Sequence, residues 1–157
     1  HDGFFSKPES VPVLNYIPIN YRDGDVITAI ASLDEYAVIF KEFSIWGMLG
    51  SWPDITIKAI SYRPDHTSLG TIDQKGIYVF DRGIAFPSHD GVYLILKGSG
   101  VNENLFTTQR LSIAIDDFYA AIDQSATMHA IYDRSRRQFR LFCNFRTGQS
   151  PNAPVVT

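Results

Sequence analysis

Short apolar runs separated by turn residues make up the pattern of the first part of the chain. β-branched and aromatic residues gather in these runs, as they do in β-strands. Four such runs cover residues 26–32, 36–41, 43–49 and 55–62. Their connections are only a few residues long, so neighbouring strands must run mostly antiparallel. The pattern therefore predicts an antiparallel sheet of four strands.

Short apolar runs separated by turn residues also occur further along the chain. Five more strands are predicted, over 76–80, 84–86, 92–96, 128–132 and 138–144, and a last short one over 155–157. Between 109 and 122 the apolar residues follow a helical period instead, at Leu111, Ile115, Phe118, Tyr119 and Ile122. This segment is predicted as either one short helix or a loop with a single helical turn.

Together these runs predict an all-β fold with one short helix or helical turn near 109–122. A loose apolar-x-Ala-Ile repeat, at 27–30, 57–60 and 128–131, fits successive antiparallel four-stranded meanders of the β-propeller type. We expect a single propeller-like domain over 1–157. It would consist of an extended lead-in (1–22), a first blade (23–63), a second blade with a connector (75–122) and the start of a third blade (127–157). Because a full propeller needs about four blades or more, a partial propeller or a fragment of a longer chain is predicted.

Composition and charge narrow the function classes. The chain is 45% hydrophobic and 20% charged, as in ordinary globular domains, and its net charge of −3 gives no overall attraction to nucleic acid or anionic membranes. No apolar run reaches the ~20 residues that span a bilayer. The one cysteine, Cys143, excludes an intrachain disulfide, and its aromatic neighbours predict a buried, unreactive thiol.

Motifs for catalysis or cofactor binding do not stand out. The four histidines lack metal-ligand spacing, and neither a Gly-x-Ser-x-Gly nor a Gly-Lys-Ser/Thr motif occurs. The sequence therefore predicts no enzyme activity, no cofactor and no metal site.

The stretch "SHDGVY", residues 88–93, has two interpretations. His89 beside Asp90 fits an acid/base pair, whereas Asp90-Gly91 between two apolar runs fits a tight β-turn. Because Phe86 ends one run and Val92 starts the next, we favour the turn, with Asp90 bonded to backbone amides and His89 at its exposed tip. His89 is then a candidate contact to a neighbouring molecule.

A cluster of arginines and one tryptophan are the other candidate contacts. "DRSRRQFR" brings together Arg134, Arg136, Arg137 and Arg140. These side chains fit either a contact with DNA phosphates or an acidic neighbour, or a hairpin tip that charge keeps soluble. Trp52, beside a proline in a loop, is a candidate contact surface and, in the alternative interpretation, stacks on a sugar.

Three stretches resemble tailed-bacteriophage virion proteins. They are "DGDVITAIASLDEYAVIFKEFSIWGMLG" from Asp23, "KGIYVFDRGIAFPSHDGVYLILKG" over 75–98 and "HAIYDRSRRQFRLF" over 129–142. Such proteins are β-propellers or propeller-like modules of the tail, neck or portal-proximal region, and the packaged-DNA stabilisation proteins of short-tailed phages are the nearest named group. The resemblance implies a non-enzymatic structural protein located in the virion.

The resemblance also implies what the chain binds. Neighbouring virion subunits are the expected partners, in a homo-oligomeric ring or a hetero-assembly, with a non-specific DNA contact that helps to retain the packaged genome. The alternative is a carbohydrate-binding module or the remnant of a propeller glycosidase.

Overall fold

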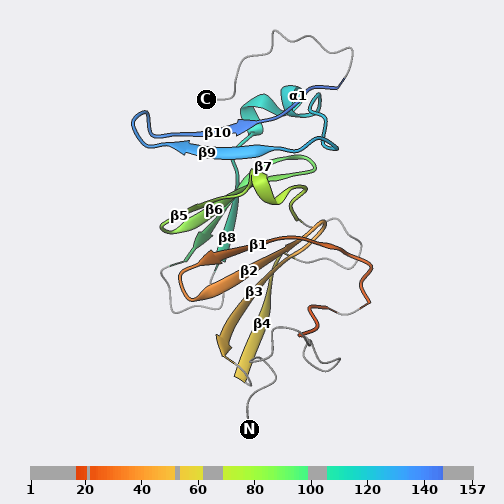
Figure 1. Ribbon diagram of the computed structural model, residues 1–157, viewed down its shortest axis with the longest axis vertical. Helices are drawn as coiled ribbons and strands as arrows, with labels where there is room; N and C mark the ends of the chain where they lie inside the picture. The colour runs from red at the N-terminus through yellow and green to blue at the C-terminus, as the bar shows by residue number, and fades with distance from the viewer. Residues whose placement is uncertain (1–16, 21, 52–53, 62–68, 99–105, 147–157) are drawn as a thin grey trace, which may run out of the picture.

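The structure, a computed structural model, describes residues 17–20, 22–51, 54–61, 69–98 and 106–146. The strands of these residues form three antiparallel sheets that follow one another along the long axis of the molecule (Figure 1). None of the three sheets closes on itself within the described parts of the chain. The predicted all-β class is confirmed at this level.

The first sheet is the predicted meander of four strands. Its strands are paired in chain order and comprise β1 (Ile27–Leu33), β2 (Tyr36–Lys41), β3 (Ile45–Ser51) and β4 (Asp54–Ser61). Alternate residues of β2, namely Tyr36, Val38 and Phe40, are buried on the face that meets the second sheet. Ile39 and Lys41, on the other face of β2, are buried as well, so only Ala37 of this strand is partly exposed.

The second sheet contains a strand that was not predicted. Its order is again that of the chain, with β5 (Tyr78–Phe80), β6 (Gly83–Ser88), β7 (Gly91–Lys97) and β8 (Phe106–Arg110). The predicted start of the helix at Gln109 is therefore wrong, because residues 109 and 110 belong to β8 and pair with β7. The helical part is short, and consists of the 3₁₀ turn η3 (Ile113–Ile115) and α1 (Asp116–Tyr119).

The third sheet is a hairpin of β9 (His129–Asp133) and β10 (Gln138–Phe142), as predicted. A 3₁₀ turn, η2 (Gln74–Gly76), lies against β9. Asp73, which precedes η2, accepts hydrogen bonds from the backbone amides of Lys75 and of Met128. Asp73 thus anchors the segment that leads into the third sheet. The strand predicted over 155–157 lies outside the described residues.

The second sheet lies between two cores. Phe86, Tyr93 and Ile95 face the first sheet and form one core with its buried residues. Val92, on the opposite face of β7, packs with Tyr119, Ile122, Met128 and Leu141 in a second core. Burial on both faces explains why all of β6 is buried and why its sequence shows no alternation of apolar and polar residues.

Candidate functional site

Hairpin turns from all three sheets lie on one side of the molecule. They are Asp34–Glu35 between β1 and β2, Asp81–Arg82 between β5 and β6, and residues 134–137 between β9 and β10, all at the left in Figure 1. We call this the turn-bearing side. Turn residues of this kind are the exposed, variable positions on which proteins commonly place binding contacts.

Lys97, at the end of β7, connects the first two of these turns. Its ammonium group lies 2.8 Å from the carboxylate of Asp34 and 3.6 Å from that of Glu35, and its amide donates to the carbonyl of Arg82. The hydrogen bond to Asp34 raises the pKa of Lys97. The acidic charge of the first turn is therefore partly compensated within the chain.

The third turn carries the predicted arginine cluster. Arg134, Arg136 and Arg137 are exposed at its tip, and Arg137 adopts a left-handed conformation with φ of 53°. Among the described residues neither Arg134 nor Arg137 has an ion-pair partner, while Arg136 lies 4.0 Å from Asp133. We call Arg134, Arg136 and Arg137 the arginine tip.

Arg140 does not belong to this tip, although the sequence placed it in the same cluster. It lies within β10, is half-buried, and pairs with Asp133 at 3.4 Å. Asp133 also accepts hydrogen bonds from the hydroxyl of Ser135 and the amide of Arg136, and these bonds lower its pKa. Asp133 and Arg140 thus fix the conformation of the turn.

His89 has several partners and is not simply an exposed tip. Its ring stacks on Phe43 with centroids 5.1 Å apart, and Nε2 lies 3.5 Å from the carboxylate of Glu42. Nδ1 lies 3.1 Å from Oε1 of Gln124, whose amide nitrogen donates to the His89 carbonyl. With 39% of its side chain exposed, His89 joins the β2–β3 turn, the β6–β7 turn and the segment before β9.

The turn in "SHDGVY" is one residue earlier than predicted. Ser88 pairs with Gly91, so His89 and Asp90 form the turn and Gly91 already belongs to β7. A Cβ on Gly91 would overlap the hydroxyl of Ser112 and the guanidinium of Arg110, so glycine is needed for close approach. This correction also changes the role expected of Asp90.

Asp90 accepts a hydrogen bond from a side chain, where backbone amides were expected. The hydroxyl of Tyr93 donates to its carboxylate at 2.8 Å, and burial together with this bond raises the pKa of Tyr93 to about 12. Arg110 donates to the backbone carbonyl of Asp90, lies over the Tyr93 ring and pairs with Asp116 at 2.9 Å. Asp90 therefore holds the β6–β7 turn against β8.

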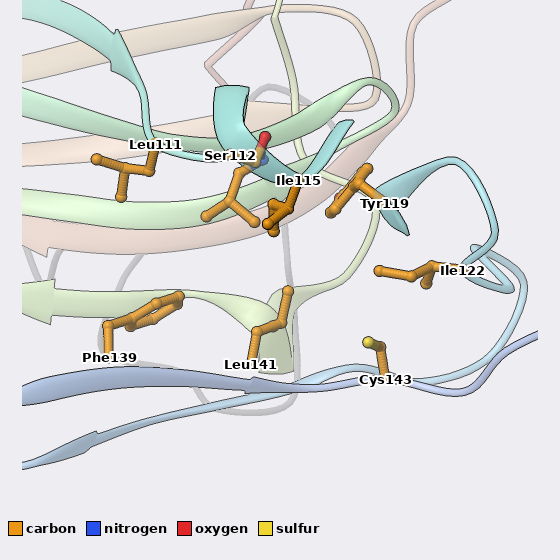
Figure 2. Close-up of a pocket in the computed structure, with 9 residues that line it drawn as sticks. Leu111, Ser112, Ile115, Tyr119, Ile122, Phe139, Leu141 and Cys143 are labelled. Carbon is orange, nitrogen blue, oxygen red and sulfur yellow. Dashed lines mark hydrogen bonds between the residues drawn. The ribbon is translucent and has the colours of Figure 1, made fainter. Parts of the chain in front are cut away.

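An apolar pocket lies between residues 111–122 and β10 (Figure 2). It encloses about 70 Å³ and is lined by Val92, Leu111, Ser112, Ile115, Tyr119, Ile122, Phe139, Leu141 and Cys143. One wall carries Leu111, Ile115 and Ile122, and the other carries alternate residues of the β10 segment. The helical spacing in the sequence identified the first wall, but nothing in it indicated a pocket.

Cys143 contributes its thiol to this pocket. The residue is only partly exposed, and burial raises the pKa of the thiol, which keeps it protonated at neutral pH. Tyr119, on the opposite wall, donates its hydroxyl to the Ser88 carbonyl at 2.6 Å, and burial raises its pKa as well. The polar groups of the pocket are thus held in uncharged forms.

Some of the predicted features lie outside what the structure describes. Trp52 is not among the described residues, so its proposed contact with a neighbour or a sugar stays a prediction. Within the described residues, no group of three or more histidine, cysteine, aspartate or glutamate residues is placed to hold a metal ion. None of the described helices has the length and apolar character needed to cross a membrane.

Comparison with known proteins adds no family to this description. No protein-family model matches the chain, and no curated protein matches it significantly. The resemblance to phage virion proteins stays a prediction from the sequence motifs in residues 23–50, 75–98 and 129–142.

Proposed function

We propose that the chain is a non-enzymatic structural subunit of a phage particle that binds neighbouring virion subunits through its turn-bearing side. The observation that carries this proposal is the placement of three hairpin turns, one from each sheet, on the same side of the molecule. Stacked meanders bury one another's faces and leave their turns free to bind. The order of the phage-like motifs supports the same proposal.

The two four-stranded sheets would be successive blades of a propeller or partial propeller. Both run in chain order and they pack face to face through Phe40, Phe86 and Tyr93. In this proposal the third sheet begins another blade, and the assembly is a homo-oligomeric ring or a hetero-assembly in the virion.

The arginine tip would supply the charged part of the contact. Within the described residues Arg134 and Arg137 have no ion-pair partner and Arg136 has only a long contact with Asp133, at 4.0 Å. Exposed guanidinium groups of this kind pair readily with carboxylates or phosphates, often in a bidentate manner. In this proposal they bind an acidic face of a neighbouring subunit, or DNA phosphates inside the particle.

Removal of two tip charges tests the proposal. Arg136→Ala with Arg137→Ala is expected to leave the fold intact, because both side chains are exposed. The same change is expected to weaken particle assembly or genome retention by about tenfold or more, since charge-assisted contacts contribute roughly 1.5–3 kcal/mol each. Melting curves and the yield of DNA-filled particles in a reconstituted assembly reaction measure the two effects.

A matched control removes two positive charges elsewhere. Lys58 and Lys75 are both exposed and lie away from the third turn, in β4 and η2. Lys58→Ala with Lys75→Ala is expected to assemble like the natural chain. Equal yields of filled particles from all three proteins would count against a function for the arginine tip.

A further inference from the structure

The size of the apolar pocket limits what it can hold. A dry apolar cavity of roughly 150 Å³ accommodates benzene, and the pocket between residues 111–122 and β10 encloses about half of that, about 70 Å³. Sites for cofactors and other drug-sized ligands are typically larger, at roughly 300–1,000 Å³. The pocket therefore suits a single branched aliphatic group, such as the side chain of leucine, isoleucine or valine.

One apolar residue of the pocket lining is exposed at the surface. Leu111, in the wall of the pocket, is 45% exposed, so the apolar lining reaches the surface of the molecule. A pocket with an apolar margin of this kind is typical of a site that receives part of another chain.

Positive charge lies at one end of the pocket. Phe139 lines the pocket and follows Arg137 by two residues, so the Cα atoms of these two residues are at most about 7 Å apart. On the opposite wall Asp116 is neutralised by Arg110 at 2.9 Å, and Asp117 is the one further acidic residue of α1. An occupant that extends toward the tip meets the guanidinium groups of the arginine tip and the carboxylate of Asp133, which is already paired with Arg140 at 3.4 Å.

We infer that the pocket and the arginine tip together bind an acidic peptide segment of a neighbouring subunit, which inserts one aliphatic side chain into the pocket. Its carboxylates, within about four residues of that side chain, pair with Arg134 and Arg137. The inference rests on the proposed function, because it names the chemistry of the partner that the turn-bearing side would bind.

Selection from a random peptide library displayed on yeast tests this inference without knowledge of the natural partner. Binders of the purified chain are expected to combine leucine, isoleucine or valine with two or more acidic residues nearby. Cys143 gives a direct way to block the pocket, because it is the only cysteine of the chain and lines the cavity. Because burial raises the pKa of this thiol, the alkylation with N-ethylmaleimide is run above neutral pH until mass spectrometry shows that Cys143 is fully modified. The modified chain is expected to bind the selected peptides about tenfold or more weakly.

Two variants complete the design. Cys143→Ser, treated with the same reagent, is expected to keep the affinity, which separates blocking of the pocket from damage elsewhere. Arg134→Glu with Arg137→Glu is expected to weaken the same peptides by about tenfold or more while leaving the melting curve unchanged. Bound peptide is also expected to slow the alkylation of Cys143 in the natural chain.

Several results would overturn the inference. They are the absence of any enriched peptide, enrichment of peptides without the acidic and aliphatic pattern, and binding that survives either alkylation or charge reversal. If one of these occurs while Arg136→Ala with Arg137→Ala still impairs assembly, the pocket inference fails and the proposed function stands.

Discussion

Replacement of Phe86 with alanine is expected to lower the free energy of unfolding by about 4 kcal/mol, as removal of a buried aromatic ring commonly does. Phe86 lies in β6 with no exposed surface. Its ring centroid lies 5.1 Å from that of Phe40 in the first sheet and 6.1 Å from that of Tyr93 in the second. The alanine variant would leave a cavity between the two sheets, and urea unfolding followed by circular dichroism measures the loss.

Phe142→Ala is the matched control. The same ring is removed, but Phe142 is 49% exposed on the outer face of β10. The expected loss is about 0.5 kcal/mol or less, the usual range for surface substitutions. Similar losses in the two variants would show that the first and second sheets are not packed through Phe86 as described.

Replacement of Lys41 with methionine is expected to destabilise the chain by about 3 kcal/mol at pH 7, because it leaves a buried carboxylate without its cation. The ammonium group of Lys41 lies 2.6 Å from Asp23, and the two side chains are only 4% and 11% exposed. Methionine keeps the length of the side chain and removes the charge. The loss is again measured by urea unfolding.

The effect of Lys41→Met is expected to depend on pH. Burial raises the pKa of Asp23, but hydrogen bonds from Lys41, the Asp25 amide and Asn20, with the charge of Lys41, outweigh burial and lower it. A carboxyl group whose pKa is lower in the folded state stabilises the fold at pH values above the ordinary carboxyl pKa. This stabilisation is lost as the pH falls below about 4. The difference between the natural chain and the variant should therefore shrink at acidic pH.

A double variant separates the ion pair from simple packing. Lys41→Met combined with Asp23→Asn removes both charges, so it is expected to be more stable than Lys41→Met alone. A loss that is the same at pH 7 and pH 3, and additive in the double variant, would contradict the role given to the pair.

The strands that contain apolar runs could be predicted from the sequence. β8 could not, and its composition shows the reason. Phe106 is the only apolar residue of β8, and Thr107 and Thr108 pair with Leu96 and Ile95 of β7. β8 is a strand because β7 offers an open edge next to it. A pairing of this kind depends on tertiary structure that local pattern does not contain.

In the candidate site, too, local features could be predicted from the sequence and tertiary contacts could not. The sequence indicated the charged hairpin, because four arginines around one turn are a local feature. Arg140 lies within β10 and pairs with Asp133, so it is separate from the arginine tip. This separation depends on a tertiary contact that the local sequence does not show. The contacts of His89 with Glu42 and Gln124 join segments far apart in the chain, and no local pattern indicates them.

The pocket could not be predicted from the sequence, because it forms between segments that are distant in the chain. The helical spacing of Leu111, Ile115 and Ile122 indicated that these residues share a face, although η3 and α1 are much shorter than the predicted helix. Phe139, Leu141 and Cys143 belong to the strand predicted over 138–144, for which the sequence indicated no particular face. That these two sets of residues meet without filling the space between them is a matter of packing between distant segments.

The central claim is that this chain is a subunit of a phage particle, and a cryo-electron microscopy structure of the purified particle whose genome encodes the chain tests that claim most directly. We expect the chain to be present as an ordered subunit whose turn-bearing side buries more than about 800 Å² against its neighbours, since crystal-type, non-specific contacts are mostly smaller. The arginine tip should lie inside that interface. A particle that lacks the chain, or in which the turns and the arginine tip face solvent, would contradict the account.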